Sequence, residues 1–351
     1  MVRPPNPATM VTATGLLLML WIISIPQPSA RTPHPLLHRT TFIPTNYSKF
    51  PISKGTKIVI SSTKADDSLT TANKSSEILI LSDIYESDDE KSYSELCPLL
   101  GSKLQVLILV TSAPSHVAPR NAIRMTWGHY ATRSNISLAF VIGTPPDSLK
   151  ALVEDEDLLY GDIIIGDFVD SYSNLTLKSI FMLEWVNKHC PLATRILKTD
   201  DDMFINVPKL IDFMENPLRL KMTKTIWGKV MKKSLPKRSS RSKYYVPNNE
   251  FPGKVYPDFT TGPAYLMTAD VIEDLLDASN TEPYVRLEDV YITGILAEKL
   301  GIKRQHATEF YNKKIKDTCM IKRGISVHMV KYHEQFDLWK KLQDGMTKCT
   351  K

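Results

Sequence analysis

The apolar run at residues 104–110 constrains the fold most, because it has the length and composition of a strand buried on both faces. A helix-like segment follows at 119–127, and strand-like and helix-like segments then alternate. We expect strands at 138–142, 162–165 and 195–198, with helices at 148–159 and 175–188 between them. Alternation at this spacing predicts an α/β fold whose parallel sheet is covered by helices on both faces.

The second half of the chain is less regular. We expect strands at 226–230 and 264–267 and helices at 269–278 and 290–300. The basic run at 229–243 is typical of a solvated loop, and a role in binding an anionic substrate or a membrane surface is the alternative.

Composition and charge exclude one class of partner. A hydrophobic share of 42% in 351 residues is ordinary for a globular chain and sufficient for a sizeable core. The net charge of +6 is modest, and no Arg-rich helix or finger-like Cys/His spacing accompanies it. We therefore expect no nucleic-acid partner.

The cysteines and sequons point to a secretory compartment. Four widely separated cysteines without a Cys-x-x-Cys pair argue against structural zinc and favour two disulfides. They are Cys97, Cys190, Cys319 and Cys349. Four Asn-x-Ser/Thr sequons agree with an oxidising environment. They begin at Asn46, Asn73, Asn135 and Asn174.

An apolar run at residues 10–25 follows Arg3 and precedes a segment rich in Pro and Ser. A cleaved signal peptide and an uncleaved membrane anchor both fit a run of this length. From residue 31 to about 96, Pro, Ser, Thr, Lys and Asp dominate and periodicity is weak, which is typical of a stem or linker.

Three consecutive aspartates, Asp200, Asp201 and Asp202, follow directly on the strand expected at 195–198. Crowded carboxylates are costly unless a cation neutralises them, and oxygen ligands suit Mg²⁺ or Mn²⁺. Such an ion can bridge the carboxylates to a diphosphate. The alternative is an acidic turn that caps a helix starting near Val207.

Two arginines at helical spacing could bind phosphate oxygens. Arg120 and Arg124 lie one turn apart on the helix expected at 119–127, and the alternative is pairing with Asp or Glu across the fold. The sequence Thr-Ser-Ala-Pro at 111–114 lacks the Gly-rich phosphate fingerprint, so a dehydrogenase is disfavoured.

Two acidic residues and one histidine complete the candidates. Glu288 and Asp289 begin the helix expected at 290–300, where a carboxylate could cap the helix or accept a proton as a general base. His328 lies in an apolar stretch, where a core position is the commoner role of a histidine.

Five segments occur in the order found in one enzyme family. They are RNAIRMTWG at 120–128, GDFVDSYSNLTLK at 166–178, KTDDDMFIN at 198–206, YPDFTTG at 256–262 and LEDVY at 287–291. Together they resemble the beta-1,3-galactosyltransferase family (glycosyltransferase family 31), and the resemblance runs from about Cys97 to Cys349. It implies a GT-A-like, mostly parallel α/β sheet flanked by helices in a single luminal catalytic domain.

The resemblance also implies an inverting mechanism with Mn²⁺ and a UDP-sugar donor, and type II anchoring in the Golgi membrane. The expected organisation is a cytosolic tail at 1–9, a transmembrane signal anchor at 10–25, a stem at 26–96 and the catalytic domain at 97–351. The expected partners are UDP-galactose, a glycan acceptor on a glycoprotein or glycolipid, and the membrane.

Carried over by position, the resemblance implies a catalytic base at Asp289 and metal ligands at Asp202 and His328. The expected donor-side residues are Arg120, Arg124, Asp167, Lys178, Asp200 and Asp201. For the disulfides we favour Cys97 with Cys190 and Cys319 with Cys349 among the three possible pairings.

Two departures from the family pattern bear on specificity. Thr260-Thr261-Gly262-Pro263 stands where close relatives often have Cys-Ser-Gly, and Asp201 is often Ser in the galactose-transferring members and Asp in the N-acetylglucosamine-transferring ones. We expect β-1,3 transfer of galactose to a terminal GlcNAc or related sugar. A β-1,3-N-acetylglucosaminyltransferase is the alternative, and a non-catalytic luminal glycan-binding protein is the third possibility.

Overall fold

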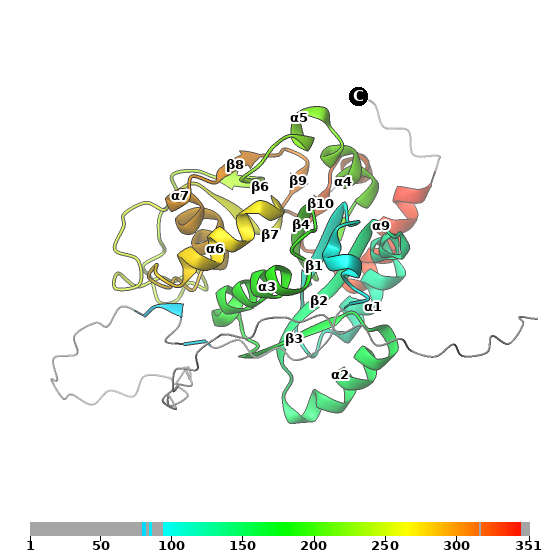
Figure 1. Ribbon diagram of the computed structural model, residues 1–351, viewed down its shortest axis with the longest axis horizontal. Coiled ribbons are helices and arrows are strands. Elements are labelled where there is room, and N and C mark those ends of the chain that lie inside the picture. The colour runs from blue at the N-terminus through cyan, green and yellow to red at the C-terminus, as the bar shows by residue number, and fades with distance from the viewer. Residues whose placement is uncertain (1–78, 82–83, 86–93, 316, 345–351) are drawn as a thin grey trace, which may run out of the picture. The chain divides into compact units, whose positions relative to one another are not determined.

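A seven-stranded mixed sheet forms the centre of the described chain, which in this computed structural model comprises residues 79–81, 84–85, 94–315 and 317–344 (Figure 1). The strands run in the order β3-β2-β1-β4-β7-β6-β8. Their bounds are β1 Val106–Thr111, β2 Ile136–Thr144, β3 Ile163–Val169, β4 Arg195–Asp200, β6 Thr225–Met231, β7 Phe259–Thr268 and β8 Lys303–His306.

Strand direction divides the sheet. The strands β3, β2, β1 and β4 are parallel, as are β6 and β8, whereas β7 runs antiparallel to both β4 and β6. The α/β class, the mostly parallel sheet and the parallel pairing expected from alternation in the first half of the chain are therefore confirmed, whereas β7 in the less regular second half is antiparallel. The reason is the connection, because the loop at 232–258 carries no crossover helix and returns the chain antiparallel to β6.

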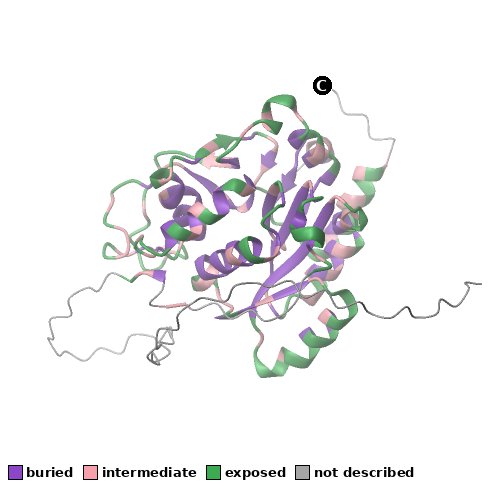
Figure 2. Ribbon diagram, viewed as in Figure 1, coloured by how far each residue is buried: buried purple, intermediate pink, exposed green. Residues whose placement is uncertain are grey.

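Helices cover both faces of the sheet and enclose two hydrophobic cores. Their bounds are α1 Val117–Met125, α2 Asp147–Tyr160, α3 Leu175–His189, α4 Val207–Met214, α5 Pro217–Leu220, α6 Ile272–Ser279, α7 Ala297–Lys299, α8 Thr318–Arg323 and α9 Tyr332–Gln343. Leu107 and Leu109 of β1 pack toward α3 and α6, whereas Val106, Ile108 and Val110 pack toward α1 and α4. Figure 2 shows the central strands buried between these layers.

Short 3₁₀ and π segments join or replace several expected helices. The 3₁₀ segments are η2 Pro98–Gly101, η3 Trp127–Thr132, η4 Tyr172–Asn174 and η5 Ala269–Val271. The helix expected at 290–300 is a π-helix, η6 Val290–Leu296, followed by α7. Wide π turns are frequent at functional sites, and η6 begins directly after Asp289.

A second, three-stranded sheet brings the late part of the chain to the end of β4. It consists of β5 Phe204–Ile205, β10 Ser326–Val327 and β9 Phe310–Tyr311. Val327 pairs with Phe204, and the N–H of Val330 donates to the carbonyl of Asp202 at 2.8 Å. These backbone contacts fix His328 beside the aspartate triplet.

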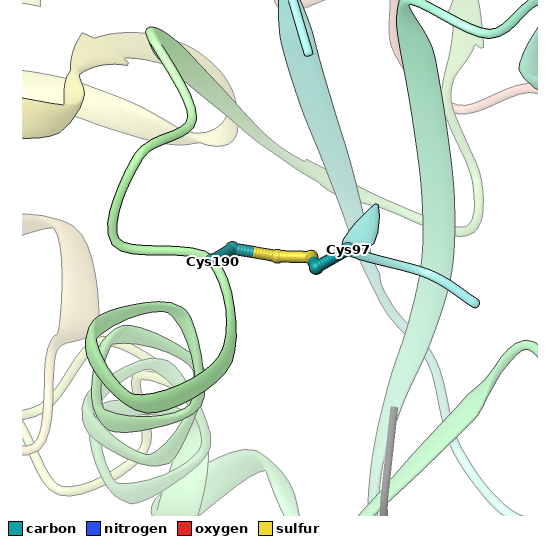
Figure 3. The surroundings of a disulfide bond; sticks show 2 residues. All are labelled: Cys97 and Cys190. Carbon is teal, nitrogen blue, oxygen red and sulfur yellow. A yellow bond between two sulfur atoms is a disulfide. The ribbon is translucent and has the colours of Figure 1, made fainter. Parts of the chain in front are cut away.

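A disulfide joins Cys97 to Cys190, with Cα atoms 5.5 Å apart (Figure 3). This is the pairing favoured in the sequence, and it ties the start of η2 to the end of α3. Cys319 is also disulfide-bonded. Its expected partner Cys349 lies outside the described residues, so that pairing stays a prediction.

The end of the expected stem packs on the sheet domain. Leu81 is buried in the core that contains α3 and α6, and the N–H of Tyr284 donates to the carbonyl of Leu79 at 3.0 Å. The expected tail and anchor, Asn46 and Asn73 all lie outside the described residues. In the part of the chain that the structure describes, no helix is long and apolar enough to span a membrane.

Candidate active site

The three aspartates at the end of β4 lie in different environments. Asp200 accepts hydrogen bonds from Thr111 Oγ1 and Lys198 Nζ, each at 2.6 Å. Asp201 accepts from Ser112 Oγ at 2.7 Å and contacts His116 Nδ1 at 2.8 Å. The third aspartate is about half exposed, so the triplet does not act as a single acidic cluster.

The triplet does not cap the following helix. Asn206 is the N-cap of α4, and its side-chain oxygen accepts a hydrogen bond from the N–H of Lys209 at 3.1 Å. Its amide also donates to the carbonyl of Ile321 at 2.8 Å. The capping alternative for the triplet is therefore wrong, and the three carboxylates need another role.

Asp202 and His328 form a pair open to solvent. His328 Nε2 lies 3.3 Å from Asp202 Oδ2, and the two side chains are 25% and 48% exposed, so His328 is not a core histidine. Burial lowers the pKa of His328, but its hydrogen bond and attraction to Asp202 outweigh burial and raise the pKa overall. One carboxylate oxygen and one imidazole nitrogen at this spacing can bind the same divalent cation. Among the described residues, this pair included, no three His, Cys, Asp or Glu side chains group closely enough to hold a metal ion.

Backbone amides hold the carboxylate of Asp289 on both sides. Gly262 N–H donates to Oδ2 at 3.1 Å and Val290 N–H donates to Oδ1 at 2.9 Å, so Asp289 also caps η6. Thr293 fixes the helix against β7, because its hydroxyl accepts from the N–H of Thr260 at 2.9 Å and lies 3.0 Å from the Thr260 carbonyl. Burial raises the pKa of Asp289 and the two amides lower it, with a net increase.

Gly262 lies close to both acidic side chains that begin η6. A Cβ atom there would lie 3.2 Å from Glu288 Oε2, a tight contact, and 3.6 Å from Asp289 Oδ2, an ordinary one. A side chain at this position would therefore require the Glu288 carboxylate to shift slightly. The glycine is part of the sequence Thr-Thr-Gly-Pro at 260–263.

A buried lysine links the two halves of the site. Lys198 is 4% exposed, and its ammonium contacts Asp200, the carbonyl of Gly262 at 2.8 Å, and Glu288 Oε2 at 3.9 Å. Tyr265 lies opposite Lys198 in the β4–β7 pair and donates its hydroxyl to Glu288 Oε1 at 2.5 Å. Burial raises the pKa of Glu288 to about 7, although the attraction of Lys198 opposes this increase.

The two arginines pair with acidic residues. Arg120 is fully buried and donates to Glu156 at 2.8 and 2.6 Å, and Arg124 donates to Glu156 at 2.7 Å and to Asp162 at 2.8 and 2.7 Å. Arg120 reaches the triplet through Ser112 Oγ, at 3.2 Å. Both arginines therefore contact α2, and Arg124 also contacts Asp162, which directly precedes β3. Contact of either arginine with a donor phosphate stays a prediction.

Lys178 and Asp167, two further expected donor-side residues, have different partners. The ammonium of Lys178 is buried and donates to Asp170 at 2.8 and 2.9 Å and to the carbonyl of Ser112. Asp167 is exposed and lies 3.5 Å from the Thr144 hydroxyl. The carboxylate that Lys178 contacts is therefore Asp170, and a donor-side role for Asp167 or Lys178 stays a prediction.

Two sequons lie in described parts of the chain. The amide of Asn174 donates to the carbonyl of Val169 at 2.9 Å, and the hydroxyl of Thr176 is buried and donates to Val285. The amide of Asn135 donates to Gln105 at 2.9 Å. Both asparagine side chains therefore hold local structure, and glycosylation of either stays a prediction.

Several contacts escaped the sequence reasoning. Thr111 and Ser112 end the first strand, and their position beside β4 was the available signal. No sequence signal pointed to His116 or Asn312. Asn312 directly follows β9 of the second sheet, and its amide donates to the hydroxyl of Thr261 on β7. These residues extend the site beyond the quoted motifs.

A carboxylate held by backbone amides lies across a buried lysine from the aspartates that end β4, an arrangement that suits an enzyme of group transfer. A family model described as "Galactosyltransferase" matches residues 118–308. The chain is 35% identical to "Beta-1,3-galactosyltransferase 5" of Pan paniscus over 68% of this chain and 81% of that protein. It belongs to the galactosyltransferase family.

A second relative is named for a different activity. The chain is 37% identical to "Lactosylceramide 1,3-N-acetyl-beta-D-glucosaminyltransferase" of Xenopus tropicalis, over 58% of this chain and 57% of that protein. Among solved structures, "Crystal structure of a glycosyltransferase involved in the glycosylation of the major capsid of PBCV-1" aligns at a TM-score of 0.39 and 11% identity, over 67% of this chain and 98% of that chain.

Proposed function

We propose that this enzyme transfers galactose from UDP-galactose in β-1,3 linkage to a terminal GlcNAc or related sugar of a glycoprotein or glycolipid, with inversion at the anomeric carbon. The observation that carries the proposal is the position of Asp289 in a galactosyltransferase-family chain. Its carboxylate is held by two amides across Lys198 from the end of β4.

Asp289 would act as the general base. A carboxylate that accepts two backbone hydrogen bonds keeps a fixed orientation, and burial raises its pKa and therefore its basicity. It would accept the proton of the acceptor hydroxyl as that oxygen attacks the anomeric carbon from the face opposite UDP. The departing UDP takes the bonding electrons, so an α-linked donor gives a β product.

Asp202 and His328 would hold a Mn²⁺ ion against the donor diphosphate. Their donor atoms fit a divalent cation, and exposure of both side chains leaves room for diphosphate oxygens. When bound, the ion would offset negative charge on the leaving group. Asp200 would orient the donor side through its contacts with Thr111 and Lys198.

The second candidate is transfer of N-acetylglucosamine from UDP-GlcNAc. Asp201 favours it, because aspartate at this position is typical of N-acetylglucosamine-transferring members. The Xenopus tropicalis relative supports it as well. The site chemistry is the same for both donors, so the choice between them depends on how the sugar is accommodated.

A donor screen tests the proposal. The secreted domain is incubated with Mn²⁺, acceptor sugars of several classes and each UDP-sugar in turn. Transfer from UDP-galactose supports the main candidate, and transfer from UDP-GlcNAc alone supports the second. Absence of transfer from every donor would contradict both.

Membrane anchoring is proposed together with the activity. The apolar run at 10–25 and the short basic tail before it would orient the catalytic domain into the Golgi lumen. The Cys97–Cys190 disulfide is consistent with an oxidising lumen. Protease protection of the catalytic domain in intact Golgi vesicles would test this orientation.

A further inference from the structure

The loop between β6 and β7, at residues 232–258, carries far more positive than negative charge. It contains seven basic residues against two acidic ones, Glu250 and Asp258. Both acidic side chains are occupied, because Glu250 pairs with Arg286 at 2.7 Å and Asp258 lies 3.7 Å from Lys232. The loop therefore presents a net positive surface that no motif of the family segments explains.

The loop is anchored directly beside the candidate base. Tyr256 packs with Phe251 and Phe259 against Val290, the residue that follows Asp289. The N–H of Tyr256 also donates to the carbonyl of Ser234 at 2.9 Å, which closes the loop on itself. The loop therefore leaves the sheet next to the candidate base.

One lysine of this loop lies over two exposed tyrosines. Lys243 Nζ is 4.8 Å from the ring centre of Tyr244 and 6.0 Å from that of Tyr172, which belongs to η4. The rings are 46% and 53% exposed. Exposed aromatic faces next to a cation suit a ligand that has an apolar ring face and a negative group. Among the described residues, no carboxylate lies within ion-pair distance of Lys243.

Tyr172 stays a neutral hydrogen-bonding group at ordinary pH. Burial raises the pKa of Tyr172 to about 12, and Tyr244, Asp289 and Asp200 add to the increase through their charge.

We propose that the acceptor is an acidic glycan, whose carboxylate, sulfate or phosphate group binds Lys243 while a sugar ring contacts Tyr172 and Tyr244. The proposal rests on the proposed transferase function and adds the substrate class. The positive loop attracts such an acceptor, and the lysine between the two rings fixes its acidic group next to the accepting sugar.

The donor diphosphate is the competing anion for Lys243. The diphosphate is expected at the Asp202–His328 pair, which is held by β5 and β10, whereas Lys243 is held by the β6–β7 loop and η4. The two assignments differ in one kinetic quantity. A lysine that binds the donor changes the KM of the UDP-sugar, and a lysine that binds the acceptor changes the KM of the acidic acceptor.

The test compares pairs of acceptors that differ only in one acidic group, using whichever UDP-sugar the protein transfers. Wild-type kcat/KM is expected to favour the acidic member by about tenfold, as for one charge-assisted contact at a partly exposed site. Lys243→Gln should reduce this ratio to about one and Lys243→Glu should bring it below one. The preference should also decline as salt increases.

Lys237→Gln is the matched control, since it removes one exposed lysine from the same loop and should keep the ratio. Tyr244→Leu should raise the KM of both acceptors while the KM of the donor stays the same. Equal use of neutral and acidic acceptors by wild type, or a rise in donor KM in Lys243→Gln, would overturn the acidic-acceptor inference but leave the proposed transferase function intact. Wild-type protein that transfers no sugar to any acceptor contradicts the proposed function as well.

Discussion

The N–H of Gly262 donates to Oδ2 of Asp289 at 3.1 Å, so the position of the candidate base is set by the backbone of β7. Asp289→Asn keeps the shape of the side chain but removes its basicity. We expect kcat to fall by about 10²- to 10⁴-fold, the usual contribution of a general base, while UDP binding is retained. Steady-state kinetics and UDP titration calorimetry measure the two effects. Asp258→Asn is the control, and a fully active Asp289→Asn protein would refute the base assignment.

The Asp202–His328 pair predicts a pH-dependent metal requirement. Asp202→Ala or His328→Ala should weaken Mn²⁺-dependent UDP binding by at least about tenfold, and a chelator should abolish it in wild type. Because the pKa of His328 is raised, the imidazole is protonated over more of the acidic range, and Mn²⁺ binding should weaken as pH falls. Calorimetric titrations at several pH values test this, with His333→Ala as the control. Undiminished binding in both variants would place the metal elsewhere.

The pKa of Glu288 predicts how stability depends on pH. Its folded-state pKa of about 7 lies above its ordinary value of 4.5, so the folded protein binds more protons between these two values. Stability should therefore decrease as pH rises from about 4.5 to 7, by roughly 1–3 kcal/mol, and Glu288→Gln should remove this part of the decrease. Denaturant unfolding at pH 5 and pH 8 measures it, with Glu273→Gln as the control. An identical pH dependence in Glu288→Gln would contradict the assignment.

The buried pair of Arg120 and Glu156 predicts a large loss of stability on removal of one partner. Arg120→Ala leaves the carboxylate of Glu156 buried beside Arg124 alone, and we expect a loss of about 3–5 kcal/mol. Glu154 lies on α2 with Glu156 but is exposed, so the control Glu154→Gln should have little effect. A normal unfolding midpoint for Arg120→Ala, together with a raised KM for the donor, would show instead that Arg120 acts on phosphate.

The Cys97–Cys190 disulfide closes a loop across 93 residues of sequence. Replacing both cysteines with serine should destabilise the domain by about 2–4 kcal/mol, chiefly because the unfolded chain regains freedom. Thermal unfolding of the double variant, compared with oxidised wild type, measures the loss. If the double variant unfolds like oxidised wild type, the cross-link has no part in stability.

The first half of the fold was accessible from sequence because each element depends on local pattern. The strands expected at 138–142 and 195–198 fall within β2 and β4. The strand expected at 162–165 overlaps the start of β3. The antiparallel β7 was not accessible, since its direction is set by a long loop without periodicity. The π-helix η6 was equally hidden, because its hydrophobic pattern resembles that of an ordinary helix.

The sequence likewise predicted some site residues but not their pairing. Charge at the ends of elements indicated the triplet and the pair Glu288–Asp289, and the family resemblance chose Asp289 of the two. Spacing could not assign partners to Arg120 or Lys178. Those partners, Glu156 and Asp170, are chosen by burial, since a buried cation requires the nearest carboxylate that can also be buried. Sequence supplies the list of charged groups, and packing decides which of them remain available to a ligand.

Lys198 has a consequence for how such an enzyme can change its substrates. Its single ammonium holds Asp200 on one strand and the Gly262 carbonyl on the next, so the separation between donor side and base is set inside the protein before any substrate arrives. New specificity cannot come from altering that separation without exposing or breaking a buried cation. We expect it to come from the 232–258 loop, where a changed residue would alter which sugar binds and would leave the Lys198 contacts as they are.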